Sequence, residues 1–289
     1  MTGLAAAILI TACMPPLPPA VAVLIDDIGY KPQEDAAVLA LPVPYAIAVL
    51  PGSPHGADLA HLARLQGREV LLHLPMEATD RDTGLGELAL RSGMDAPAMK
   101  AVLDQALSSV PHAIGVNNHM GSMLTGQPEV MRWLMESLQR QGPRFFIDSR
   151  TTPDTVAAMA AAEAGLAGLS RKVFLDHVRT REAVREALAE LVASAKEEGH
   201  ALAIGHPFPE TLAELEKWSP EDEGVELLSL QALLARKVAL ESGSAIARRP
   251  QCESERQQPQ YAGAPGRPRQ LVEIEGDALL GATHQPASE

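Results

Sequence analysis

Short apolar segments that end in polar residues recur along most of this chain, with amphipathic segments between them. The apolar runs cover residues 21–25, 44–50, 69–74, 113–117, 144–147, 173–175 and 201–205, with a weaker run at 225–230. Near-continuous aliphatic runs are typical of parallel strands, which are buried on both faces. Residues 95–109, 127–141 and 180–198 instead place apolar residues at helical spacing. This alternation predicts βα units and a parallel sheet.

The number of these units favours a barrel over a six-stranded open sheet. Seven or eight units within about 210 residues are typical of an α/β barrel fold. We therefore expect a deformed (β/α) barrel of about seven parallel strands over residues 21–238, with a doubly wound sheet as the alternative.

Residues 239–289 are rich in Arg, Gln, Pro, Ser and Glu, and bury too little apolar surface to offset their ordering entropy. We expect a disordered C-terminal tail there.

The charge balance limits the partners of the chain. It contains 37 acidic and 24 basic residues, for a net charge of −13. Nucleic-acid binding depends on Lys and Arg that neutralise phosphates, so the composition excludes a nucleic-acid partner and favours a neutral or cationic substrate. The two cysteines, Cys13 and Cys252, show no zinc-motif spacing and no disulfide framework.

Residues 1–20 combine a short apolar run with small residues and prolines. This pattern is typical of a signal peptide, although the basic start is missing, and the run is too short to span a bilayer. Residues 10–13 also resemble a bacterial lipobox, in which Cys13 would be lipidated. We expect a periplasmic or otherwise exported envelope protein, with peripheral membrane attachment only if Cys13 is lipidated. A cytoplasmic location follows if the segment is not a signal.

Polar side chains follow most of the predicted strands. They are Asp26-Asp27-Ile28-Gly29, His73, Asn117-Asn118-His119, Asp148-Ser149-Arg150, Asp176-His177 and His206. The carboxyl ends of barrel strands surround one cavity, where the working residues of such enzymes lie. A single carboxylate here is often only a helix cap. Capping alone does not explain five such strands, so we expect a site on this face.

The adjacent carboxylates of Asp26 and Asp27 indicate a metal. In an extended chain they point to opposite sides, so one can enter a metal shell while the other faces the substrate. Without a cation, burial of both would force one to take up a proton. An Asp oxygen with two imidazoles suits zinc and leaves a position for water. We expect Asp27, His73 and His119 to hold a divalent metal, with Zn²⁺ preferred.

Five segments in this order resemble the divergent polysaccharide deacetylase family. They are VAVLIDDIGY, LLHLPME, IGVNNHMGS, FFIDSRT and ALAIGHPFPET, and the resemblance covers residues 21–235. It implies a deformed (β/α) barrel and a metal-dependent hydrolase that removes N- or O-acetyl groups from a carbohydrate, usually with zinc. The implied partner is an acetylated glycan or oligosaccharide.

The resemblance assigns roles to matching residues. It places Asp26 as the general base, Asp27 and His73 as metal ligands, and His206 as the general acid. Much of the superfamily has a second histidine four residues after the first, but this chain has Glu77 there.

The third ligand is therefore either His119 or Glu77. Asn118 and Asp148 are further candidates for binding metal or substrate. Backbone amides near Ile28 and Gly29 could complete an oxyanion site, although Gly29 could simply permit a tight turn.

Two other function classes compete with the hydrolase. A catalytically inactive envelope protein could use the same barrel to bind a glycan or a protein, and Glu77 in place of histidine favours this alternative. A glycosidase would need two carboxylates across a cleft. Asp26 and Asp148 could serve, but the three histidines would then be unexplained. Trp133 lies on an apolar helix face, which indicates a core residue rather than a sugar platform.

Overall fold

The computed structural model describes residues 17–80 and 84–243. Residues 1–16, with the lipobox-like Cys13, and residues 244–289, with most of the predicted tail and Cys252, lie outside the described residues. The signal-like segment and the disordered tail therefore stay predictions. No helix in the described ranges is long and apolar enough to cross a membrane.

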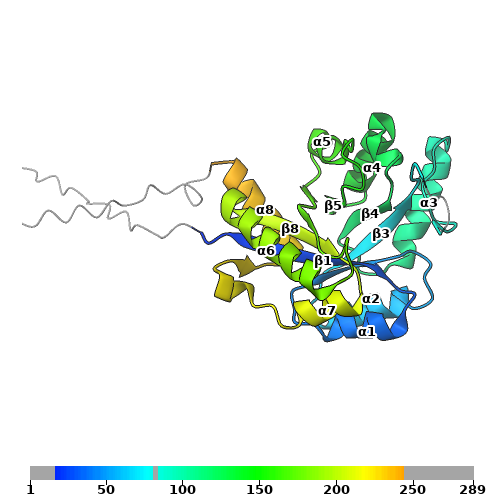
Figure 1. Ribbon diagram of the computed structural model, residues 1–289. Coiled ribbons are helices and arrows are strands. Elements are labelled where there is room, and N and C mark those ends of the chain that lie inside the picture. Colours follow the sequence, from blue (N-terminus) through cyan, green and yellow to red (C-terminus); the bar gives the residue numbers. More distant parts are fainter. Residues whose placement is uncertain (1–16, 81–83, 244–289) are drawn as a thin grey trace, which may run out of the picture. The chain divides into compact units, whose positions relative to one another are not determined.

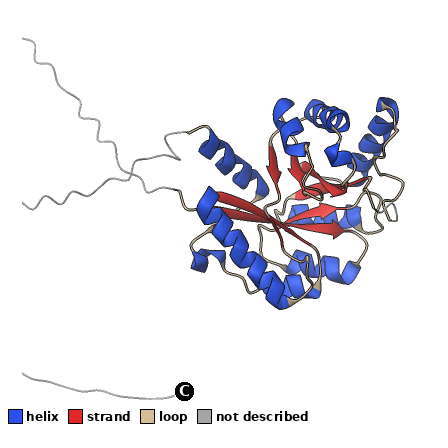
Figure 2. Ribbon diagram, turned by 45° about the horizontal axis from the view of Figure 1, so that its top comes forward, coloured by secondary structure: helices blue, strands red, loops and turns tan. Residues whose placement is uncertain are grey.

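A parallel sheet forms the centre of the fold (Figures 1 and 2). Its nine strands in the described residues are β1 (Ala20–Ile28), β2 (Ala46–Val49), β3 (Val70–Met76), β4 (Gly115–Met120), β5 (Phe145–Asp148), β6 (Gly168–Ser170), β7 (Val173–Phe174), β8 (His200–Gly205) and β9 (Glu226–Leu227). The strand order is β6-β5-β4-β3-β2-β1-β8-β7, and β9 pairs with β1. In the described residues β6 and β7 do not pair with each other, so the sheet is a half-barrel, and the predicted α/β barrel class is confirmed.

Helices pack against this sheet (Figure 2). They are α1 (Pro32–Ala40), α2 (Gly56–Leu65), α3 (Ala96–Ser109), α4 (Pro128–Arg140), α5 (Ala157–Glu163), α6 (Arg181–Glu198), α7 (Pro209–Leu215) and α8 (Leu230–Glu241), with short 3-10 turns at Leu124–Gly126 and Pro220–Glu223. In Figure 1, α1, α2 and α7 form one group below the sheet, and α3, α4 and α5 form another above it. Helices α3 and α6 each begin after a capping side chain, because Asp95 and Thr180 accept hydrogen bonds from Ala98 N and Ala183 N.

Both faces of the strands are buried, which explains their continuous apolar sequence. In β1, Val21, Val23 and Ile25 belong to the core that packs against the outer helices. Ala20, Ala22 and Leu24 face a second, inner cluster, which also contains Leu230, Leu233 and Leu234 from α8. The inner cluster fills the barrel below the strand ends, so polar chemistry is confined to those ends.

The end of the domain differs from the prediction. The expected strand at 225–230 is only Glu226–Leu227, and Leu230 already begins α8, which continues past residue 238 to Glu241. A partly buried carboxylate fixes this start, because Glu69 accepts hydrogen bonds from the backbone N of Leu230 and Gln231. Strand β6 was not predicted because it is only three residues long and contains Gly168 and Ser170.

Candidate metal centre and active site

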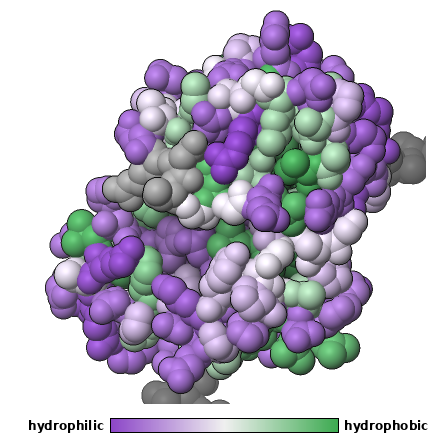
Figure 3. Space-filling model, turned by 90° about the vertical axis from the view of Figure 1, so that its right-hand side faces the viewer, coloured by the Kyte–Doolittle hydropathy of each residue, from purple (hydrophilic) through white to green (hydrophobic). Residues whose placement is uncertain are grey.

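The predicted convergence of polar residues occurs at the carboxyl ends of the strands. The register of β3 and β4 pairs His73 with Asn117 and Pro75 with His119, so both imidazoles leave neighbouring strands at the same edge. A cavity of about 510 Å³ opens there, and Asp26, His73, His119 and His206 line it. Figure 3 shows this face, which has a hollow near its centre bordered by hydrophilic residues.

The end of β1 is irregular, and this brings both carboxylates to one histidine. Asp27 has a left-handed backbone (φ 63°), and the pairing of β1 with β2 shifts register between Ile25 and Ile28. As a result Asp26 Oδ2 lies 3.6 Å and Asp27 Oδ1 lies 3.2 Å from His73 Nε2. The expectation that the two side chains point to opposite sides is therefore wrong, because it assumed an extended chain.

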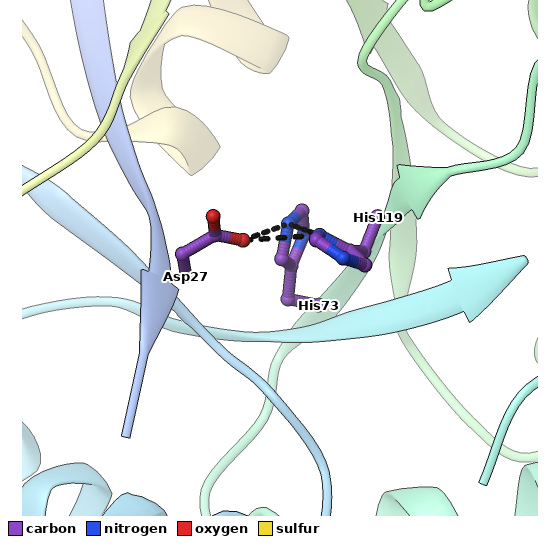
Figure 4. Close-up of side chains that lie close together, drawn as sticks. All are labelled: Asp27, His73 and His119. Carbon is purple, nitrogen blue, oxygen red and sulfur yellow. Dashed lines mark hydrogen bonds and ion pairs between the residues drawn. The ribbon is translucent and has the colours of Figure 1, made fainter. Parts of the chain in front are cut away.

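Three atoms from three strands form a small triangle (Figure 4). Asp27 Oδ1 lies 3.0 Å from His119 Nδ1 and 3.2 Å from His73 Nε2, and the two ring nitrogens are 3.1 Å apart. In a tetrahedral zinc site with bonds of about 2.0 to 2.1 Å, neighbouring ligand atoms lie about 3.3 Å apart. Asp27 Oδ1 is buried and has no hydrogen bond of acceptable geometry. The donor set and its spacing therefore fit a divalent cation.

Asn117 orients the central histidine. Its Oδ1 lies 3.0 Å from His73 Nδ1, which assigns the ring proton to Nδ1 and leaves the lone pair of Nε2 directed at the triangle. Its Nδ2 donates to Asp26 Oδ1 at 2.9 Å and to Ser149 Oγ at 3.2 Å. One buried amide thus connects His73, Asp26 and Ser149.

The pKa values of the two carboxylates shift in opposite directions. Burial raises the pKa of Asp26 above its usual range, although His73 and His206 lower it in part. Burial has the same effect on Asp27, but the imidazoles of His119 and His73 outweigh it and hold the pKa of Asp27 well below its usual range. Environments that separate the pKa values of neighbouring acids are typical of sites that assign them different roles.

His206, which directly follows β8, faces the triangle. Its Nε2 lies 3.7 Å from Asp27 Oδ2, and its Nδ1 lies 2.9 Å from Asp176 Oδ1. Asp176 Oδ2 also accepts from the His206 backbone N at 2.6 Å and from Thr211 Oγ1 at 2.9 Å. Burial opposes a positive charge on His206, but Asp176 outweighs it and raises the pKa of the imidazole. Asp176 therefore holds the orientation of His206 and stabilises its positive charge.

The remaining candidates have local partners. Glu77 lies outside the triangle, and its Oε2 accepts from the backbone N and the Oγ of Ser92. Asn118 bridges the backbone, because its Oδ1 accepts from Ser149 N and its Nδ2 donates to the Met120 carbonyl.

Asp148 accepts from Arg150 N and Thr155 Oγ1. The amide of Gly29 donates to Asp35 Oδ2, so it does not face an oxyanion. Trp133 packs against the core, as expected.

Arg171 and Phe174 line the cavity but were not singled out from the sequence. Ser149, Arg150 and His177, which follow predicted strands, line it as well. Arg171 lies between β6 and β7, where the chain passes from one edge of the half-barrel to the other. No pattern along the chain marks the start of that link, because β6 is too short to give an apolar run.

The comparisons with known proteins agree with this architecture. The parallel half-barrel, with carboxylates and imidazoles at its strand ends, is an α/β barrel fold. The sequence model of the divergent polysaccharide deacetylase family matches residues 23–234, and the chain belongs to that family.

Bacterial proteins share its sequence or its fold. The chain is 37% identical over 214 residues to the uncharacterized protein YibQ of Escherichia coli, covering 74% of this chain and 66% of that protein. An uncharacterized Haemophilus influenzae protein is 38% identical over 195 residues, covering 68% of this chain and 69% of that one. A crystal structure of an uncharacterized Agrobacterium tumefaciens protein matches the fold with a TM-score of 0.72 and 21% identity, over 75% of this chain and 89% of that one. The chain thus spans about two thirds of the length of its curated relatives.

Proposed function

We propose that this protein is a metal-dependent hydrolase that removes acetyl groups from a carbohydrate of the cell envelope. The observation that carries the proposal is the triangle of Asp27, His73 and His119 with Asp26 and His206 beside it. Membership of the divergent polysaccharide deacetylase family supports a carbohydrate substrate. The envelope location rests on the signal-like pattern of residues 1–20.

Asp27, His73 and His119 would hold the cation, with Zn²⁺ preferred for an oxygen and two imidazole nitrogens. When bound, a divalent cation supplies polarisation of a carbonyl and a lowered pKa for water. The low pKa of Asp27 keeps it ionised as a ligand, and Asn117 keeps the His73 lone pair directed inward.

Asp26 and His206 would transfer the protons. Asp26 keeps Oδ2 close to the ligand triangle while Oδ1 accepts from Asn117, so it is placed to take a proton from the attacking water. His206 presents Nε2 to the cavity and binds Asp176 through Nδ1. It would protonate the departing amine or alkoxide.

The test is acetate release by the purified full chain from a panel of N-acetylated and O-acetylated oligosaccharides, with and without added Zn²⁺. The variant Asp26→Asn retains an oxygen that can accept from Asn117, so it should keep the metal and lose about 10²- to 10⁴-fold in rate. The exposed Asp222 lies in the turn Pro220–Glu223, and Asp222→Asn is the matched control.

Metal content identifies the ligands separately from turnover. Asp27→Ala and His119→Ala should lose stoichiometric metal, whereas Glu77→Ala should retain it because Glu77 binds Ser92 outside the triangle. Stoichiometric metal in both triangle variants would contradict the ligand set. Glycan binding without acetate release across the panel would instead favour the inactive envelope protein.

A further inference from the structure

The cavity differs in charge from the rest of the chain. The whole chain carries a net charge of −13. Among the described residues that line the cavity, Asp26 is the only acid, whereas Arg150 and Arg171 are both cationic and His177 lies beside them. A positively charged cavity in an acidic protein attracts anionic ligands.

Arg171 is held in a fixed orientation. Its Nε donates to the Ser149 carbonyl at 2.7 Å, its Nη2 donates to the Arg150 carbonyl at 2.8 Å, and its guanidinium lies 4.9 Å from the centre of the Phe174 ring. Nη1 has no hydrogen-bond partner in the described part of the chain. A planar guanidinium held in this way presents its free edge without further loss of side-chain freedom.

Arg150 is exposed and lies beside Arg171 at the end of β5. Its backbone is left-handed (φ 48°), and its N donates to Asp148 Oδ1. Its guanidinium forms neither a hydrogen bond nor an ion pair with any residue that the structure describes. The buried Asp148 offsets part of the charge of both arginines, but it accepts its hydrogen bonds from Arg150 N and Thr155 rather than from either guanidinium.

More positive charge lies near His206. The guanidinium of Arg179 lies 3.9 Å and Lys31 Nζ lies 5.7 Å from the centre of the Phe208 ring. That ring is 5.5 Å from the ring of His206. Neither cation pairs with a carboxylate within the described residues, although acids outnumber bases in the chain.

We propose, resting on the proposed deacetylase function, that the substrate is an anionic glycan, and that Arg150 and Arg171 bind its acidic group beside the acetylated position. The acidic group is a carboxylate or a phosphate ester, because both match the donor edge of a guanidinium. The cavity of about 510 Å³ accommodates a few sugar units. The net charge of the chain favoured a neutral or cationic substrate, whereas the charges at the site favour an anionic one.

Binding is measured by calorimetry, so the result does not depend on turnover. The probes are a trigalacturonate, the neutral galactose trisaccharide, and the same neutral trisaccharide with a phosphate ester at O6. At least one anionic probe should bind about tenfold more tightly than the neutral one, and salt should weaken that binding. The carboxylate and phosphate probes together show which acid is preferred.

The variant Arg150→Gln tests whether the arginine or a bound metal causes the preference for anionic probes. Because the Arg150 side chain has no partner in the described residues, this variant should fold normally. It should lose about tenfold in affinity for the anionic probe and less than about twofold for the neutral one. Arg132→Gln removes the same charge from an exposed position on α4 and should change neither affinity.

Equal binding of the anionic and neutral probes would overturn the proposal. So would an anion preference that Arg150→Gln leaves intact. An anion preference without acetate release would support this inference while contradicting the proposed hydrolase.

Discussion

Asn117 and His73 are joined side by side across β3 and β4, with Asn117 Oδ1 3.0 Å from His73 Nδ1. The same amide donates to Asp26, so a buried residue that enters no metal shell links a ligand to the proposed base. Partners of this kind fix the tautomer and orientation of a ligating histidine.

Asn117→Ala should lower zinc affinity about 10- to 100-fold, because His73 loses the acceptor that directs Nε2 inward. Competition with a chelating indicator measures this affinity. Ser149→Ala removes only the second acceptor of the Asn117 amide, so it serves as the control and should have a much smaller effect. An Asn117→Ala affinity within about twofold of the wild type would show that packing alone orients the imidazole.

Asp176→Asn should slow acetate release about 100-fold or more while metal content and KM stay close to their original values. Asp176 accepts from both Nδ1 and the backbone N of His206, so the variant weakens the support of the proposed acid without touching the triangle. Steady-state kinetics and metal analysis provide the measurement. The control is Thr211→Val, which removes one hydrogen bond to Asp176 and should slow acetate release only slightly. A rise in KM with unchanged kcat would instead assign Asp176 to substrate binding.

The sequence predicted those parts of the fold that depend on local periodicity and on parallel-strand geometry. Continuous aliphatic runs marked the long strands, and parallel strands must bring their carboxyl ends to one edge. Asp26, Asp27, His73, His119 and His206 were identified on this basis, and the structure places them around one cavity or its ligand triangle.

Residues whose roles depend on register could not be identified in this way. Asn117 and Asn118 are adjacent, and only the pairing of β3 with β4 places Asn117 beside His73 while Asn118 binds the backbone. The left-handed backbone of Asp27 is likewise a tertiary effect, because a non-glycine residue at φ 63° needs surrounding structure to hold it. Arg171 enters the site through the link that follows β6, a strand too short to be predicted from the sequence.

Gly29→Ala should destabilise the fold by about 2 to 4 kcal/mol and displace the end of β1. Gly29 has φ 126°, and an added Cβ would lie 2.0 Å from Ser53 Oγ and 2.6 Å from Ser53 Cβ. Chemical denaturation measures the free energy of unfolding. The control is Gly67→Ala, where φ is 77° but no atom lies within 4 Å of the added Cβ, so only about 1 kcal/mol should be lost.

The double variant Gly29→Ala/Ser53→Gly separates the clash from the backbone strain. Removing the Ser53 side chain relieves the 2.0 Å and 2.6 Å approaches but leaves the unfavourable φ. Its stability should therefore recover part of the loss. If Gly29→Ala costs no more than Gly67→Ala, close packing against Ser53 does not constrain this turn.

Glu69 should make the docking of α8 sensitive to pH. Its carboxylate accepts from Leu230 N and Gln231 N, yet burial outweighs these bonds and raises its pKa above the usual value. An acid with a raised pKa in the folded state binds its proton more tightly there than in the unfolded chain. Its contribution to stability is therefore greatest below its usual pKa and falls as the pH rises through the raised pKa.

Glu69→Gln cannot ionise, so the free energy of unfolding of the variant relative to the wild type should increase as the pH rises from about 4 to 8. The absolute difference also includes the loss of a carboxylate at the start of α8, so the informative quantity is its change with pH. Urea denaturation across this range measures it. Glu87→Gln removes an exposed carboxylate and should show no comparable trend. A difference that shifts in favour of the wild type as the pH rises would mean that the amide hydrogen bonds of α8, and not burial, control the ionisation of Glu69.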